Sequence, residues 1–127
     1  MAIEYVRRTP TTNQEYFNSQ LQQAINQIVN RVNIDYTKIT TATYSIKVDE
    51  LFLDVNVSTS VALTLPTKSP IGTNYIIKDT SGNASTYNIV IFAGSGETIE
   101  GVATKTISTN YGSLKIIYNG NNKWLTF

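Results

Sequence analysis

The residues that could carry out chemistry are few in this sequence. Its 127 residues include no His and no Cys. Histidine is the commonest general base and metal ligand, and cysteine supplies thiolates and disulfides, so the usual serine–histidine, thiolate and disulfide chemistries have no residues to use. Any reactive site would have to be built from carboxylates, hydroxyls and lysine amines.

The carboxylates form one group that deserves testing. Asp49, Glu50 and Asp54 are close in sequence and could bind Ca²⁺ or form a carboxylate pair for glycoside cleavage. However, Asp49 and Glu50 resemble a turn, and Asp54 falls on the outer face of a predicted strand, which favours solvated positions. Ser69 beside Lys68 could form a nucleophile and base, but both fall in a predicted exposed loop. We therefore expect no enzymatic activity, no cofactor and no metal site.

The composition favours a β-rich protein with a neutral polar surface. Charged residues make up 15% of the chain, hydrophobic residues 41%, and the formal net charge is +1. A charged fraction near one quarter is typical of globular domains. This balance indicates neither nucleic acid nor an anionic membrane as a partner. In addition, no apolar run reaches the length that spans a bilayer.

One stretch, from Thr12 to Val32, predicts a helix. Thr12 and Glu15 have the spacing of a capping box. Apolar residues then recur every three or four positions and form one stripe: Phe17, Leu21, Ala24, Ile25, Ile28, Val29 and Val32. An isolated helix of this length is marginal in water, so something must cover the stripe. Copies of the same helix or the chain's own sheet could do so; the stripe's width and terminal position favour a trimeric helical bundle or coiled coil.

The residues before this helix form a short segment, Met1 to Pro10. They suit either a frayed terminus or an arm that docks on a partner. The contacts of such an arm would be Ile3, Tyr5, Arg7 and Arg8, because tyrosine and arginine are enriched at interface anchors.

From Tyr44 onward the apolar pattern changes to period two. Eight or nine short strands separated by turns predict an antiparallel β-sandwich or small barrel, jelly-roll-like in kind. Asn119-Gly120 predicts a type I′ hairpin. The expected core consists of Leu51, Leu53, Val55, Val61, Leu63, Leu65, Ile76, Ile89, Ile91, Ile99, Ile107, Leu114, Ile116, Tyr118 and Trp124. A chain that ends inside a predicted strand is expected to be a self-contained module.

These patterns predict three parts: an arm over residues 1–10, a helix and connector over residues 11–42, and a β head over residues 43–127. Tyrosine is enriched in the chain, with eight residues. Exposed tyrosines among Ser, Asn and Thr can stack on sugar rings, and Tyr75, Tyr87 and Tyr111 are the possible glycan contacts. Cross-strand aromatic packing is the alternative role for them.

Several segments together resemble a β module of tailed-bacteriophage structural proteins, found in tail-fibre and spike heads, head fibres and capsid decoration proteins. They are Thr64-Leu65-Pro66, the run from Ile77 to Ile91, the piece from Gly96 to Gly101, and the stretch from Asn110 to Trp124. The resemblance covers the C-terminal part of the chain. It implies a homotrimer with a helical bundle and β heads, and it implies no enzymatic activity.

The short chain favours one place on such a particle. A small addition to the capsid surface, as a cement protein or head fibre, would direct its arm and helix toward the shell. Its partners would be its own copies and the major capsid protein or another virion protein. The alternatives are a tail-fibre or spike component that binds a host surface glycan, and a hydrolytic spike. In each case the protein would be made in the host bacterial cytoplasm and incorporated into the virion.

Overall fold

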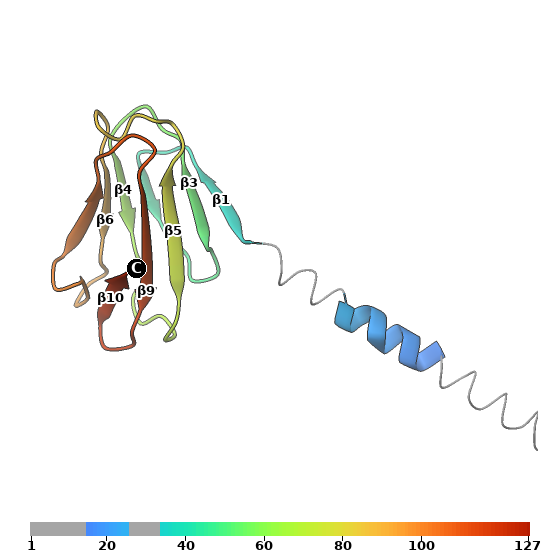
Figure 1. The fold of residues 1–127 in the computed structure, drawn as a ribbon. Helices are drawn as coiled ribbons and strands as arrows, with labels where there is room; N and C mark the ends of the chain where they lie inside the picture. Colours follow the sequence, from blue (N-terminus) through green and yellow to red (C-terminus); the bar gives the residue numbers. More distant parts are fainter. Residues whose placement is uncertain (1–14, 26–33) are drawn as a thin grey trace, which may run out of the picture. The chain divides into compact units, whose positions relative to one another are not determined.

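The computed structural model describes residues 15–25 and 34–127 (Figure 1). The chain divides into two compact units, Met1–Ile34 and Asp35–Phe127. In the first unit, residues 15–25 form a helix, as the sequence predicts, and all of their side chains are exposed. Phe17, Leu21 and Ile25, spaced four apart, lie on one side of this helix with exposed fractions of 52%, 48% and 43%.

The second unit is the predicted head, and it is mainly β. Its strands are β1 (Tyr36–Ile39), β2 (Thr43–Ser45), β3 (Phe52–Val55), β4 (Val61–Thr64), β5 (Asn74–Asp79), β6 (Ile89–Phe92), β7 (Thr98–Ile99), β8 (Thr104–Ile107), β9 (Ser113–Tyr118) and β10 (Lys123–Thr126). They form a first sheet in the order β1-β3-β5-β9-β10-β7 and a second sheet in the order β2-β4-β6-β8. Buried residues from both sheets form one core, as the two layers in Figure 1 suggest.

The chain alternates between the two sheets from β1 to β8, so the predicted antiparallel arrangement is wrong for much of the head. Strands β1, β3 and β5 are parallel neighbours in the first sheet, and β2, β4 and β6 are parallel neighbours in the second. From β1 to β6, each connection between two parallel neighbours passes through a strand of the opposite sheet. The chain therefore winds three times around the core, through β1–β2, β3–β4 and β5–β6. Antiparallel pairs β5–β9, β6–β8 and β9–β10, and the parallel pair β7–β10, then complete the mixed sheets.

The core contains most of the residues that the sequence predicts, with one error of register. Leu53, Leu63, Ile91 and Trp124 are fully buried, for example. In β5, however, Tyr75 and Ile77 are buried, and the predicted core residue Ile76 is only half-buried on the outer face. Leu51 and Leu114 are half-buried too.

Two boundaries also differ from the prediction. The expected connector contains β1, so the head begins at Asp35 rather than at residue 43. The β9–β10 hairpin is present, but its turn is not type I′, which needs two consecutive central residues with positive φ. Here Gly120 (φ 87°) and Asn122 (φ 57°) have positive φ, and the Asn119 N–H donates to the Lys123 carbonyl at 3.0 Å.

Candidate functional site

Two loops of the head are joined by the carboxylate of Asp79, the last residue of β5. Its side chain is 1% exposed. Oδ1 accepts hydrogen bonds from the Ser81 N–H (3.1 Å), the Ser81 hydroxyl (2.7 Å) and the Gly82 N–H (3.1 Å). Oδ2 accepts from the N–H groups of Ala84 and Tyr111, both at 3.0 Å. One side chain therefore fixes the loop after β5 to the loop before β9.

These donors control the ionisation of Asp79. Burial alone would raise the pKa of this carboxyl group, but the hydrogen bonds from Ser81, Tyr111, Ala84 and Gly82 favour the charged form and lower the pKa below its ordinary value. The loops are thus organised around an ionised carboxylate.

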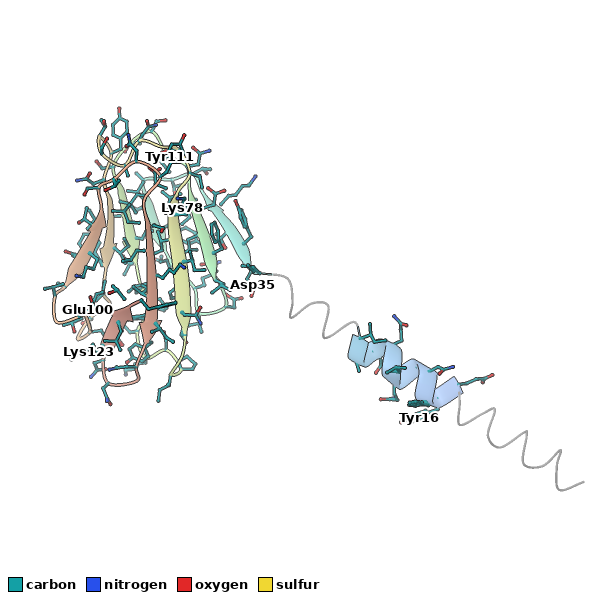
Figure 2. The ribbon with its side chains drawn as sticks, viewed as in Figure 1. Tyr16, Asp35, Lys78, Glu100, Tyr111 and Lys123 are labelled. Carbon is teal, nitrogen blue, oxygen red and sulfur yellow. The ribbon has the colours of Figure 1, made fainter. Side chains whose placement is uncertain are left out.

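Tyr111 presents an exposed ring on this frame. Its backbone has a φ of 59°, a left-handed conformation that costs a non-glycine residue about 1 kcal/mol, and its side chain is 61% exposed. The ring packs against Gly82, where an added Cβ would lie 2.5 Å from it. The Lys78 ammonium donates to the Tyr111 carbonyl, and both residues are labelled in Figure 2. An aromatic ring fixed in this way can stack on a sugar ring.

The three tyrosines predicted as glycan contacts have different positions. Tyr87, 38% exposed, lies in the loop that follows β5, where its N–H donates to the Asn83 carbonyl at 2.7 Å. This loop is also joined to the Tyr111 loop by the Ser85 N–H and Asn110 Oδ1, 2.9 Å apart. Tyr75 is fully buried, and its hydroxyl donates to the Lys47 carbonyl at 2.9 Å. The prediction is therefore wrong for Tyr75, which is a core residue.

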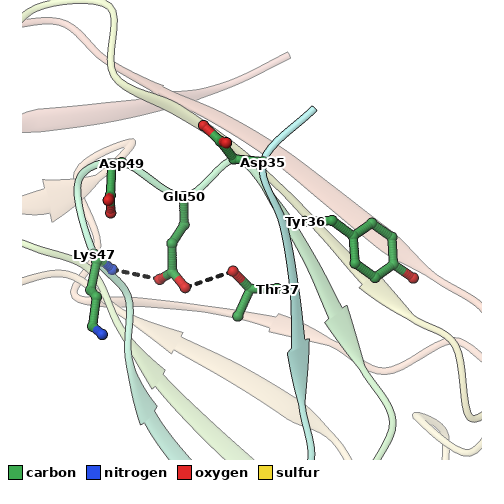
Figure 3. A pocket seen from close by; sticks show the side chains of 6 residues that line it. All are labelled: Asp35, Tyr36, Thr37, Lys47, Asp49 and Glu50. Carbon is green, nitrogen blue, oxygen red and sulfur yellow. Dashed lines mark hydrogen bonds between the residues drawn. The ribbon is translucent and has the colours of Figure 1, made fainter. Parts of the chain in front are cut away.

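A second polar site is an open pocket of about 290 Å³, shown in Figure 3. It is lined by Asp35, Tyr36, Thr37, Lys47, Asp49 and Glu50. Glu50 accepts hydrogen bonds from the Thr37 hydroxyl (2.6 Å), the Tyr44 hydroxyl (2.5 Å) and the Lys47 N–H (2.8 Å). It thereby joins β1 of one sheet to β2 of the other, and it is half-buried rather than solvated as predicted.

The shared hydrogen bond affects both of its partners. The bond to Glu50 is the main reason that the pKa of Tyr44 rises to about 12. Burial would raise the pKa of Glu50, but the hydroxyl and N–H donors lower it. Glu50 is therefore a charged structural acceptor with three partners, not a proton donor.

The remaining buried carboxylates also have structural partners. Asp54, predicted to be solvated, is only 8% exposed and accepts from the hydroxyls of Tyr36 (2.5 Å) and Thr80. Glu97 accepts from the Trp124 indole N–H at 3.1 Å and from the Tyr118 hydroxyl at 3.3 Å. Among the described residues, no three His, Cys, Asp or Glu side chains group closely enough to hold a metal ion.

The other predicted contact residues belong to the N-terminal unit. In the helix, Phe17, Leu21, Ala24 and Ile25 are exposed in the single chain. The rest of the stripe, Ile28, Val29 and Val32, and the proposed arm contacts, Ile3, Tyr5, Arg7 and Arg8, lie outside the described residues. Within residues 15–25 and 34–127, no helix is long and apolar enough to cross a membrane.

The site residues therefore include an exposed apolar helix face and an exposed aromatic ring on a fixed loop frame. The carboxylates of greatest chemical interest serve as acceptors that join strands and loops. Comparison with models of protein families and with curated proteins finds no match for this chain.

Proposed function

We propose that this protein is a non-enzymatic structural protein of a tailed-bacteriophage virion, a homotrimer that decorates the capsid surface as a cement protein or head fibre. The observation that carries the proposal is the exposed row of Phe17, Leu21 and Ile25 on one helix face. Burying apolar area is favourable by about 25 cal/mol per Å², so three copies gain stability by packing these rows together. The phage virion is proposed as the particle because the head segments resemble those of phage virion proteins.

The head supports the same assignment. Glu50, Asp54, Asp79 and Glu97 each accept hydrogen bonds that join strands or loops, which suits a rigid projecting module. In the proposed assembly the N-terminal arm contacts the major capsid protein or another virion protein, and the heads face outward. Imaging the particle with this protein present and deleted tests the location, and its copy number separates a capsid position from a tail tip.

The oligomeric state tests the helix directly. Light scattering of the intact protein should give the mass of three 14.1 kDa chains. Leu21→Asp should dissociate the trimer, because a charge at the centre of a helical interface loses its hydration. The β signal in circular dichroism should persist, since the head is a separate unit.

Gln23→Asp is the matched control, because it adds the same charge on the opposite side of the helix. It should remain a trimer. A monomeric unmodified protein, or a Leu21→Asp variant that remains trimeric, would exclude this mode of assembly.

The fixed ring of Tyr111 favours a second function, the binding of a host surface glycan by a tail-fibre or spike component. Tyr111→Ala should then abolish binding on a glycan array while leaving the unfolding midpoint nearly unchanged, because the ring is largely exposed. Tyr16→Ala removes an exposed tyrosine from the helix and should bind like the unmodified protein. An array on which the unmodified protein binds nothing would count against this function.

A further inference from the structure

The outer face of the first sheet carries an apolar strip that crosses its strands. The register places Tyr36 beside Phe52, Phe52 beside Ile76, and Ile76 beside Lys115. In the adjacent row Ile117 lies beside Leu125. The apolar strip therefore consists of Tyr36, Phe52, Ile76, Ile117 and Leu125, and it passes over β1, β3, β5, β9 and β10, which are neighbours in the sheet.

This strip is accessible and held in a fixed shape. Its two ends are exposed, Tyr36 at 56% and Leu125 at 37%, and Phe52, Ile76 and Ile117 between them are half-buried. The rings of Tyr36 and Phe52 stack with centroids 5.2 Å apart, and the Tyr36 hydroxyl is held by Asp54 at 2.5 Å. An exposed, contiguous apolar surface on a soluble domain commonly marks an interaction site. The fixed rings reduce the entropy lost when a partner binds.

Lysines surround the strip. Lys38 and Lys78 lie in the row on one side of it, Lys115 lies within it, and Lys123 follows the hairpin near Leu125; Figure 2 labels Lys78 and Lys123 toward opposite ends of the sheet. In the rows of Tyr36 and Lys38 the carboxylate is Asp54, which already accepts two hydroxyl donors. At the β10 end Glu100 accepts from the Thr126 N–H, beside Leu125, and forms an ion pair with Lys105 at 3.7 Å. The face is therefore basic with an apolar centre, and it fits a partner surface with an apolar contact and carboxylates around it.

The head itself carries a surface with an apolar residue and carboxylates, where β1 begins and β2 ends. The turn between β2 and β3 exposes Val48, 47% accessible, next to Asp49. Asp49 and Asp35, which precedes β1, both line the pocket of Figure 3, together with Lys47. We call Asp35, Val48 and Asp49 the acidic corner. Tyr36 lines the pocket as well as belonging to the apolar strip, and Figure 3 shows its ring on the opposite side of β1 from the Glu50 side chain.

Charge favours one of two ways in which a second copy of the chain could pack on this face. Two first-sheet faces packed together would oppose lysine against lysine, which is unfavourable. The acidic corner of a neighbour against the lysine-flanked strip is complementary. A contact between two different patches is heterologous, and it closes into a ring when the rotation between copies suits the number of subunits.

We propose that the apolar strip binds the acidic corner of the next head, so that the three heads form a closed ring. This inference rests on the proposed homotrimer, and it adds an interface between the heads to the one between the helices. In it, Val48 packs on the strip, and Asp35 and Asp49 approach the lysines around it.

Cysteine cross-linking can test this interface cleanly because the chain has no native cysteine. Val48→Cys combined with Lys115→Cys places one thiol in each patch, and a short bismaleimide should convert the protein into covalent trimers on a denaturing gel. Val48→Cys combined with Thr106→Cys is the control, because Thr106 is exposed on the second sheet. The control should give severalfold less covalent oligomer.

Further variants separate the possible results. Asp49→Lys in the Val48→Cys, Lys115→Cys background should reduce the covalent trimer severalfold by replacing attraction with repulsion. Covalent dimers from Lys115→Cys alone would show a face-to-face contact and overturn the proposal. A light-scattering trimer that cross-links no better than the control would overturn the head interface while leaving the helical trimer intact. A monomer would overturn both.

Discussion

Asp79→Ala is expected to lower the free energy of unfolding of the head by about 3 kcal/mol, because it leaves several backbone donors without an acceptor. The carboxylate holds the N–H groups of Ser81, Gly82, Ala84 and Tyr111. The Ala84 N–H is buried, so water cannot easily replace its partner. Urea unfolding followed by circular dichroism measures the effect.

The pH dependence of this difference identifies the ionised carboxylate as its source. The pKa of Asp79 is lowered in the folded protein from an ordinary value of 3.8. Its contribution is therefore fully present above that value and is lost as the pH falls toward the folded pKa. The difference in the free energy of unfolding between the unmodified protein and Asp79→Ala should be constant near neutral pH and should become smaller in acid.

A matched variant shows whether the loss of any carboxylate would lower the free energy of unfolding to the same extent. Asp49 is exposed, and Asp49→Ala should change the free energy of unfolding by no more than about 0.5 kcal/mol. If Asp79→Ala were equally mild, the loops would have to be held by other contacts, and the fixed position of Tyr111 would need another explanation.

Local pattern predicted which strands exist and most of what they bury, but it could not set every register. In β5, Tyr75, Ile76 and Ile77 are all apolar, so alternation alone does not choose the inner face. The strand ends at a polar residue, Asp79, yet this residue is buried with Tyr75 and Ile77. A carboxylate with five donors behaves as a core residue, and those donors come from loops that no local pattern brings together.

The sequence pattern could not predict the relative direction of the strands either. A period of two residues describes parallel and antiparallel strands alike. Tyr36 pairs with Phe52, and Phe52 with Ile76, only because the chain crosses to the second sheet and returns. This return is a long-range property of the whole head. It also explains why the Thr-rich segment that was predicted as a connector contains β1, the first strand of the winding.

The candidate site was found in part. Residue type selected Tyr75, Tyr87 and Tyr111 together, but burial separates the first from the other two. The Asp79-Thr80-Ser81-Gly82 run was the overlooked signal, since an aspartate often accepts from backbone N–H groups two residues on. The partner loop containing Tyr111 lies 32 residues away in sequence, beyond the reach of such a signal.

Trp124→Ala should have the largest effect of any single substitution considered, a loss of about 4 kcal/mol in the free energy of unfolding. Trp124 is fully buried, and its ring contacts those of Tyr75 and Tyr118 at centroid distances of 5.6 Å and 5.0 Å. The variant leaves a large cavity and removes the indole donor from buried Glu97. Because this is the chain's single tryptophan, unfolding must be followed by circular dichroism rather than tryptophan fluorescence.

Trp124→Phe separates the two causes of this loss. Phenylalanine fills much of the cavity but donates no hydrogen bond, so it should cost about 1–2 kcal/mol, the price of one unpaired buried acceptor. Glu97 would still accept from the Tyr118 hydroxyl at 3.3 Å and from the Lys68 N–H at 2.9 Å. If phenylalanine were as damaging as alanine, the hydrogen bond to Glu97 rather than the packed ring would dominate. If both were mild, the stability of the head would not depend on the packing of this ring.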